Sequence, residues 1–293
     1  MGLDVFEAWP QAQDRLQQAH EVLGWQVEAL CAPERKDDLP ITLYTQPALY
    51  CLSVIYHEIL REKGVAPSYV AGHSAGEYAA LTAAGSWDFA TGLRVIAKRA
   101  ELMHNAQGEG GMAAVLGLDP QVISEVCEAC DAGHVAIANY NSPKQTVISG
   151  DKAAVDAVVP LLKEKKAKRV VPLPVSGAFH SVLMRQAQDE FRAFMDEIRL
   201  EAPSALFVSN NQGVIVVEPA EIKSQLVRQF CEPVRWVDCM NVLAVECSAA
   251  VEVGPGNVLT GLARQCTPDL PCLKTDTWEG IEQVVQDESI HAE

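Results

Sequence analysis

The chain opens with apolar residues at helical spacing, and no strand pattern comes before them. The apolar positions of this first predicted helix are Leu16, Ala19, Val22, Leu23 and Val27. A second helical pattern covers residues 47–63. Gln46-Pro47 is expected to form its first turn, and Gly64 is expected to end it. An α/β protein usually starts with a strand, so this helical opening is unusual.

A short apolar run at Tyr69 to Ala71 is followed by Gly72-His73-Ser74-Ala75-Gly76 and then by a helical pattern over residues 75–84. Strand, G-x-S-x-G and helix in that order are typical of a nucleophile elbow. The pattern predicts that Ser74 is held on a strained turn and that the Ala75 N–H faces an oxyanion hole. From the pattern alone, an ordinary strand–turn–helix with a serine cap stays open.

After a helix predicted over residues 89–106, the pattern changes to alternating strands and helices. Strands are expected at 111–116, 134–139, 145–149 and 169–174, with helices at 120–129 and 152–165. The order β-α-β-β-α-β is that of a ferredoxin-like unit. We therefore expect residues 108–174 to form a subdomain inserted into a larger α/β domain made of residues 1–107 and 175–293.

The larger domain is expected to resume with a helix over 182–198 and a strand over 205–208. Helices at 220–230 and 234–245 and a strand at 249–253 follow, and a glycine-containing loop leads to a helix at 257–265. A last strand is expected at 270–274. The acidic tail after Asp276 is expected to fray.

Length and composition suit one large domain with an insertion, because the chain has 293 residues of which 48% are hydrophobic and 6% aromatic. No apolar run has the length of a membrane span, and acidic residues near the start do not fit a signal peptide. Nine cysteines, an odd number without framework spacing, predict reduced thiols in a cytoplasmic protein. Cys127 and Cys130 form one C-x-x-C on a predicted helix, where packing is the better interpretation than metal binding.

The formal net charge of −16 argues against nucleic acid as a partner. The otherwise acidic chain contains one basic run, which consists of Lys163, Lys165, Lys166, Lys168 and Arg169. Such a run is either the solvated end of a helix or a docking patch for an acidic partner, and both interpretations stay open.

Several segments occur in the order typical of one enzyme family. They are Thr45-Gln46-Pro47-Ala48, Gly72 to Tyr78, Arg99, Asn139 to Pro143, Gly177 to Ser181, Pro233 to Trp236 and Glu252 to Gly256. In these segments the chain resembles the malonyl-CoA:acyl carrier protein transacylases, from Met1 to about Gln265. The resemblance implies an α/β-hydrolase-like domain with a parallel sheet and an inserted ferredoxin-like subdomain.

The resemblance also implies an activity, namely transfer of a malonyl group from coenzyme A to the phosphopantetheine thiol of an acyl carrier protein in fatty-acid biosynthesis. The acyl group passes through a serine ester, with malonyl-CoA as substrate and with no metal or other cofactor. We expect a monomer that uses neither a membrane nor nucleic acid. Alternatives are a trans-acting acyltransferase of polyketide synthesis, a malonyl-transfer subunit of malonate decarboxylase, a serine thioesterase, or a carrier-protein binder without catalysis.

Acyl transfer by a serine needs a base, because the hydroxyl is a weak nucleophile until its proton is removed. His73 adjoins Ser74, but neighbouring side chains point apart at such a turn, and the resemblance gives the role of base to His180. We place His73 among the substrate-binding residues. The resemblance further implies that a main-chain carbonyl orients the imidazole, and we expect it in the loop from Gly254 to Asn257, with Asn257 as the candidate.

Arg99 is the candidate residue for recognising the acyl group. A buried arginine without an acidic partner favours an anion, and a guanidinium offers two parallel donors to a carboxylate such as that of malonyl. A surface arginine at a helix end is the plainer interpretation. We expect Gln46 to orient Arg99 or the acyl group.

Members of the family begin with a strand and a Gly-Gln-Gly-x-Gln loop, whose second glutamine supplies an oxyanion N–H. Met1-Gly2 falls just after the place of that motif. We expect the missing strand to lie beside the elbow strand, and we expect slower catalysis and lower stability without it. Ala75 is then the one oxyanion donor that the sequence names.

Overall fold

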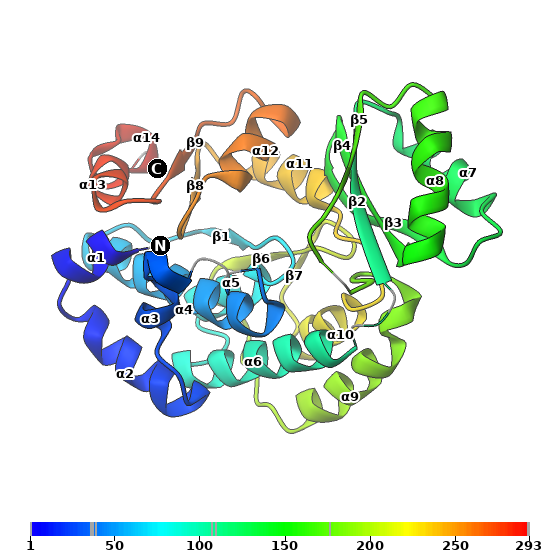
Figure 1. Cartoon of the computed structure of the whole chain (residues 1–293). Helices are drawn as coiled ribbons and strands as arrows, with labels where there is room; N and C mark the ends of the chain where they lie inside the picture. Colours follow the sequence, from blue (N-terminus) through cyan, green and yellow to red (C-terminus); the bar gives the residue numbers. More distant parts are fainter. Residues whose placement is uncertain are drawn as a thin grey trace.

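The structure is a computed structural model that describes residues 2–35, 38, 40–106, 108, 110–175 and 177–291. A helix-rich main part carries a four-stranded sheet at one side, drawn in green at the right of Figure 1. The chain begins with helices α1 (Leu3–Ala8), α2 (Ala12–Leu23) and α3 (Val27–Cys31) and the short 3₁₀ helix η1 (Pro33–Arg35). Gly24 ends α2 with φ of 75°, so the helix predicted through Val27 is interrupted there.

Helix α4 (Thr42–Glu62) runs through the core, and the prediction that it starts at Gln46-Pro47 is wrong. Pro47 lies inside the helix, where it removes one main-chain donor. Burial of the apolar residues around it, among them Ala48, Cys51 and Leu52 at 0% exposure, compensates for that loss. The predicted end is confirmed, because Gly64 has φ of 88° and its N–H donates to the Arg61 carbonyl.

The elbow segment consists of β1 (Tyr69–Ala71) and α5 (Gly76–Ala83), followed by α6 (Phe89–Asn105). Strand β1 pairs in parallel with β6 (Leu206–Ser209), which pairs antiparallel with β7 (Val214–Val216), a strand that we did not predict. Within the described residues β1 has this one neighbour, and the further strand expected beside it stays a prediction.

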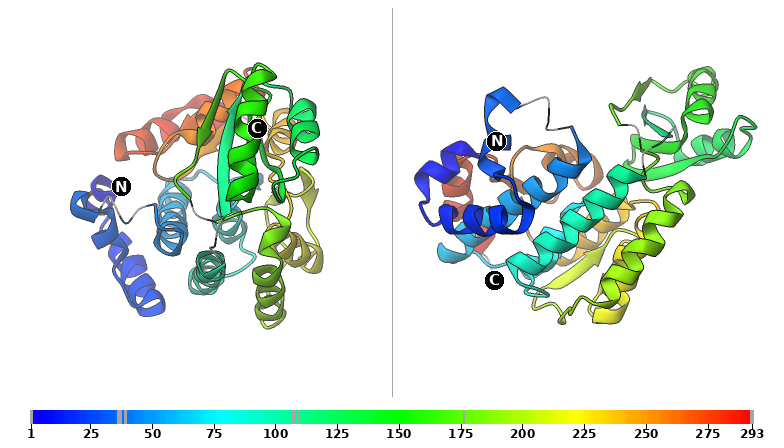
Figure 2. Two further views of the ribbon diagram at one scale, coloured as in Figure 1. Left: turned by 45° about the vertical axis from the view of Figure 1, so that its right-hand side comes forward. Right: turned by 60° about the horizontal axis from the view of Figure 1, so that its bottom comes forward.

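The inserted sheet has the strand order β3-β4-β2-β5, with all neighbours antiparallel. Its elements are β2 (Gly110–Leu116), α7 (Pro120–Glu128), β3 (Val135–Ser142), β4 (Gln145–Asp151), α8 (Lys152–Glu164) and β5 (Arg169–Pro172). Both helices lie on one face of the sheet (Figure 2) and share with it a core of its own. The predicted ferredoxin-like unit is present. Its limits at 108 and 174 stay a prediction, and residues 1, 107 and 293 lie outside the described residues.

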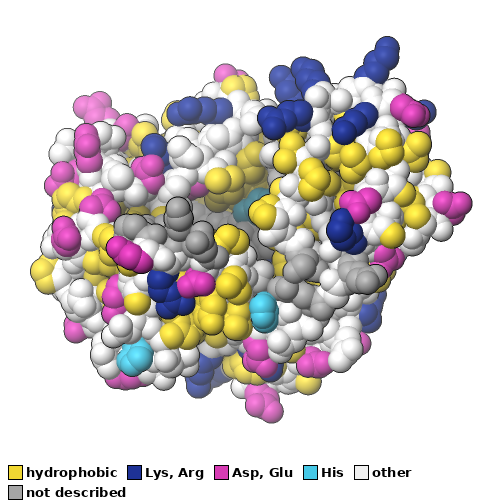
Figure 3. Space-filling model, viewed as in Figure 1, with side chains coloured by type: hydrophobic (Ala, Val, Ile, Leu, Met, Phe, Trp, Pro, Cys, Tyr) yellow, Lys and Arg dark blue, Asp and Glu magenta, His cyan; other side chains and the backbone are white. Residues whose placement is uncertain are grey.

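Strand β3 also ties the inserted sheet to the main part. The Tyr140 N–H donates to the Val234 carbonyl, and the Val234 N–H donates to the Ala138 carbonyl, at 2.8 and 2.9 Å. Val234 lies just before α11, so these two bonds fix the edge of the insertion beside the main part. The surface is hollowed where the two meet (Figure 3).

The remaining elements of the main part are η2 (Val182–Met184), α9 (Arg185–Asp196), α10 (Pro219–Arg228), α11 (Trp236–Glu246), β8 (Ala250–Glu252), α12 (Val258–Cys266) and β9 (Cys272–Lys274). Strands β8 and β9 form a separate parallel pair. With β1 and β6 this gives the parallel strand pairs expected of an α/β fold, next to the antiparallel β7.

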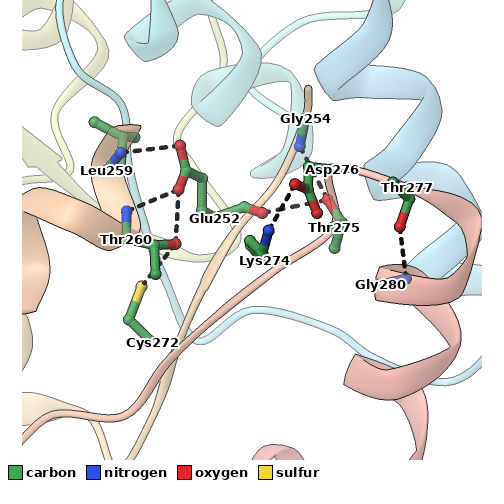
Figure 4. Close-up of polar contacts among 10 residues, drawn as sticks. All are labelled: Glu252, Gly254, Leu259, Thr260, Cys272, Lys274, Thr275, Asp276, Thr277 and Gly280. Carbon is green, nitrogen blue, oxygen red and sulfur yellow. Dashed lines mark hydrogen bonds and ion pairs between the residues drawn. The ribbon is translucent and has the colours of Figure 1, made fainter. Parts of the chain in front are cut away.

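The prediction of a frayed tail after Asp276 is wrong. Helices α13 (Trp278–Gln286) and α14 (Glu288–His291) follow, and Ile281 and Val284 are 0% and 1% exposed. The Thr277 hydroxyl caps α13 by accepting from the Gly280 N–H (Figure 4). The tail folds because its few apolar residues share one helical face and pack on the main core.

None of the nine cysteines forms a disulfide bond in the structure. Within the described residues no helix is both long enough and apolar enough to cross a membrane.

Candidate active site

Ser74 lies at the turn between β1 and α5 with φ of 52°, a left-handed conformation that a serine rarely adopts. Gly72 makes this turn possible. A Cβ at Gly72 would lie 2.0 Å from the Gly76 carbonyl carbon, so only glycine fits the close approach of the two backbones. The strained strand-to-helix turn predicted from the motif is therefore present.

Asn210, directly after β6, holds this turn through hydrogen bonds to the main chain of Gly72 and Ser74. Its Oδ1 accepts from the Ser74 N–H at 2.7 Å, and its Nδ2 donates to the Gly72 carbonyl at 2.7 Å. The side chain is fully buried. We did not predict this residue from the sequence, although a polar residue at the carboxyl end of a strand is a usual signal for a site.

Ser74 and His180 form a hydrogen-bonded pair, with 2.9 Å between Ser74 Oγ and His180 Nε2. His180 Nδ1 donates to the main-chain carbonyl of Gln229 at 2.7 Å. A carbonyl only accepts, so Nδ1 carries the proton and Nε2 presents its lone pair to the serine hydroxyl. The structure thus brings together the two residues that we predicted as nucleophile and base.

The expectation that a carbonyl of the Gly254 to Asn257 loop orients His180 is wrong. The acceptor is Gln229, which directly follows α10, where a helix end leaves carbonyls without an intrahelical partner. Gly254 of that loop forms a hydrogen bond with Thr275 instead (Figure 4). The Gly254 N–H donates to Thr275 Oγ1 at 3.0 Å, and the Glu252 carboxylate caps α12 through the N–H groups of Leu259 and Thr260.

Burial, followed by the charge of Arg99, lowers the pKa of His180 from 6.5 to about 3. The imidazole is therefore neutral at neutral pH and able to accept a proton from Ser74. Burial also lowers the pKa of His73.

Arg99, from α6, is 1% exposed, so the interpretation as a surface arginine is wrong. Its Nη1 donates to Gln46 Oε1 at 2.5 Å, which is the orienting contact expected of Gln46. Its Nη2 donates to Ser74 Oγ at 3.0 Å and to Gln229 Oε1 at 2.7 Å. The rings of Tyr78 and Phe230 lie 5.6 and 5.7 Å from the guanidinium carbon.

Among the described residues no carboxylate forms an ion pair with Arg99, and its buried Nε–H has no hydrogen-bond partner. The residues that hold the guanidinium are neutral amides and a hydroxyl. A buried cation held in this way attracts an anion, and it can donate hydrogen bonds beside the nucleophile.

Gln229 and Glu77 were missed from the sequence, yet they join the parts of the site. Gln229 Nε2 donates to Glu77 Oε2 and, at 3.3 Å, to the Ser74 carbonyl. Glu77 Oε1 accepts from the Asn210 N–H at 2.7 Å. Burial raises the pKa of the Glu77 carboxyl to about 8, although the Asn210 N–H and the Arg99 charge both lower it.

His73 points toward the inserted sheet. Its Nε2 lies 2.8 Å from Asn141 Oδ1, and its ring meets the Trp236 ring edge-on at 5.4 Å. Its predicted part in substrate binding stays a prediction. The Ala75 N–H has no acceptor among the described residues, as an oxyanion donor requires, and that role too stays a prediction.

The described residues include no group of three or more His, Cys, Asp or Glu side chains that could hold a metal ion.

Comparison with known protein families matches residues 1–275 to the acyl transferase domain family. The chain belongs to this acyl transferase family.

Relatives of this acyl transferase carry specific names. A malonyl CoA-acyl carrier protein transacylase of Synechocystis is 41% identical over 271 residues, which cover 92% of this chain and 90% of the relative. A polyketide biosynthesis malonyl CoA-acyl carrier protein transacylase of Bacillus subtilis is 38% identical over 275 residues, which cover 92% and 93%. The solved structure of a malonyl-transacylase in complex with a type II polyketide acyl-carrier protein is 34% identical with a TM-score of 0.94, covering 98% of this chain and 94% of that one.

Proposed function

We propose that this acyl transferase moves a malonyl group from coenzyme A to the phosphopantetheine thiol of an acyl carrier protein, through an ester on Ser74. The observation that carries the proposal is the buried Arg99 guanidinium. It has no carboxylate partner among the described residues, and it lies 3.0 Å from Ser74 Oγ. A malonyl ester on Ser74 would place its free carboxylate close to this cation. The names of the relatives agree with this choice of acyl group.

In the first half-reaction, Ser74 Oγ attacks the thioester carbonyl of malonyl-CoA while His180 Nε2 takes the hydroxyl proton. The oxyanion that forms is stabilised by the Ala75 N–H at the start of α5. The C–S bond then breaks, the coenzyme A sulfur takes the proton from His180, and the malonyl ester remains on Ser74.

The second half-reaction runs the same steps with a different thiol. The phosphopantetheine thiol gives its proton to His180 Nε2 and attacks the ester carbonyl. The C–O bond to Ser74 breaks, and Ser74 Oγ recovers the proton from His180. The Gln229 carbonyl holds the imidazole through both halves, since its bond to Nδ1 leaves Nε2 free to exchange the proton.

For the carrier protein, the basic run at the end of α8 supports the choice of an acidic partner. Its five residues are exposed and form no ion pair within the described part of the chain, whose net charge is strongly negative. Figure 3 shows Lys and Arg side chains gathered over the upper end of the inserted sheet. Such a patch attracts an acidic protein to the same side as the hollow. Fatty-acid biosynthesis is the pathway that we propose, with a monomer in the cytoplasm, and polyketide synthesis is the second candidate because one relative is named for it.

Intact mass measurement after mixing the protein with malonyl-CoA tests the proposal. A malonyl adduct that forms on the wild type, is absent from Ser74→Ala and is discharged by a holo carrier protein is the expected result. Release of free malonate without transfer would show a thioesterase. An unchanged mass would show a protein that binds without catalysis, and either of these results overturns the proposal.

A further inference from the structure

Glu77 lies at the start of α5, is fully buried, and forms no ion pair with any described residue. Each of its carboxylate oxygens accepts from a different part of the site. Oε1 accepts from the Asn210 main-chain N–H at 2.7 Å, and Oε2 accepts from Gln229 Nε2. An ionised carboxylate accepts hydrogen bonds only, so it suits a position that faces two donors.

Besides its contact with Glu77, Gln229 accepts two hydrogen bonds from other residues of the site. Its main-chain carbonyl accepts from His180 Nδ1, and its side-chain Oε1 accepts from Arg99 Nη2, both at 2.7 Å. An amide has an oxygen on one side and an NH₂ group on the other. If the Gln229 amide turned over, its NH₂ would face the guanidinium, and two donors would meet.

We propose that Glu77 is a positioning residue, which fixes the Gln229 amide with its oxygen toward Arg99 and thereby aims the guanidinium at the acyl group on Ser74. The acyl selectivity that this implies rests on the proposed function. Without an acceptor at Glu77, the Gln229 amide loses its preferred orientation, and Arg99 loses one of its two amide contacts. Selectivity for a carboxylated acyl group then falls, because it depends on where the guanidinium points.

The test compares rates of Ser74 loading from malonyl-CoA and from acetyl-CoA, measured by intact mass at pH 8.5, above the pKa of about 8 of Glu77. Glu77→Gln keeps the shape but replaces one acceptor with a donor. We expect the malonyl-to-acetyl rate ratio to fall about tenfold, as for the loss of one hydrogen bond to a charged group. Gln229→Ala keeps the carbonyl that holds His180 but removes the amide, so the ratio should fall similarly.

The double variant Glu77→Gln with Gln229→Ala gives the sharpest result. If Glu77 acts through the Gln229 side chain, its substitution should lower the ratio no further once that side chain is gone. Glu58→Gln is the matched control. Glu58 on α4 is half-buried and accepts from the Arg15 guanidinium at 2.6 Å, so its substitution removes a partly buried contact without touching the site. Its malonyl-to-acetyl ratio should equal that of the wild type.

Equal losses for both acyl groups, an unchanged ratio, or additive effects in the double variant would each overturn the proposal. Should Glu77→Gln fail to fold, Glu77→Asp replaces it. Its shorter carboxylate cannot reach both donors, so the same fall in ratio is expected. A wild type that forms no malonyl ester refutes the proposed function instead, which keeps the two failures distinct.

Discussion

Replacing Asn210 with alanine should strongly destabilise the protein. The change leaves the Ser74 N–H and the Gly72 carbonyl without the partners they now have at 2.7 Å. Each unsatisfied buried group costs about 1–3 kcal/mol, so the expected loss in free energy of unfolding is about 2–6 kcal/mol. In a chain of this size that loss lowers Tm by about 5–20 °C.

Asn211→Ala is the matched control, because the neighbouring asparagine is also buried, at 6% exposure. Its Nδ2 donates to Glu232 at 2.7 Å, while its Oδ1 has no partner in the described residues. The Glu232 carboxylate is 40% exposed, so water can replace the lost donor, and the substitution should cost only about 1 kcal/mol.

Urea denaturation and thermal melts of the two variants measure the difference, and malonyl loading of folded protein measures the effect on the turn. Loading by Asn210→Ala should fall about 100-fold or more, the usual penalty for a reacting group displaced by about 1 Å. Asn211→Ala should load at close to the wild-type rate. If the two variants have the same stability and load equally fast, the Asn210 amide does not hold the strained turn, and our account of the elbow is wrong.

Three further predictions concern Arg99, His180 and the basic run. Arg99→Ala should lower malonyl loading by at least about 30-fold, from the roughly 2–5 kcal/mol of a desolvated charge pair, and should leave acetyl loading little changed; equal losses would assign Arg99 to the fold. Since the folded-state pKa of His180 is about 3 instead of 6.5, the unfolded chain binds the extra proton first as pH falls below 6.5. Stability should therefore drop by about 1.4 kcal/mol per pH unit from that group between pH 6.5 and 3. Urea midpoints at pH 7.5 and 5 should differ less in His180→Gln than in the wild type, and equal differences would contradict the burial argument. Lys165→Glu with Lys166→Glu should raise KM for the carrier protein at low salt without slowing loading from malonyl-CoA. The control Arg94→Glu, at an exposed position on α6, should change neither quantity. If KM for the carrier protein is unchanged by the charge reversal, the carrier binds at another surface.

The elbow and the inserted unit could be predicted because their signals are local. Small residues at fixed spacing around Ser74 permit one kind of turn, and alternating patterns over residues 110–172 give the order of a known supersecondary unit. Arg99 and His180 could also be chosen, but mainly from the resemblance to the family, which gave His180 the role of base and favoured Arg99 as the group that binds the malonyl carboxylate.

The residues that hold this chemistry in place could not be found in the same way. Asn210 lies 136 positions from Ser74 and Gln229 lies 155, so their contacts exist only once the sheet and α10 are assembled. The carbonyl of Gln229 carries no signal at all, because every residue has one. We placed the carbonyl near Asn257 on resemblance alone, and that choice was wrong. Helix α13 did have a local signal that we missed, because Trp278, Ile281, Val284 and Val285 recur at helical spacing.

The Gln229 carbonyl that accepts from His180 Nδ1 affects which nucleophile takes the acyl group from Ser74. An aspartate in that place would stabilise the imidazolium by its charge and make the imidazole a stronger base. A neutral carbonyl does this less, so the base is mild. A thiol, with a pKa near 8.5, still gives up its proton to a mild base, whereas water holds its own far more strongly. The Ser74 hydroxyl is also a weak acid, but the turn holds it 2.9 Å from His180 Nε2, which offsets its weak acidity. In the proposed reaction, the Gln229 carbonyl therefore protects the serine ester from hydrolysis and leaves it for the thiol of the carrier.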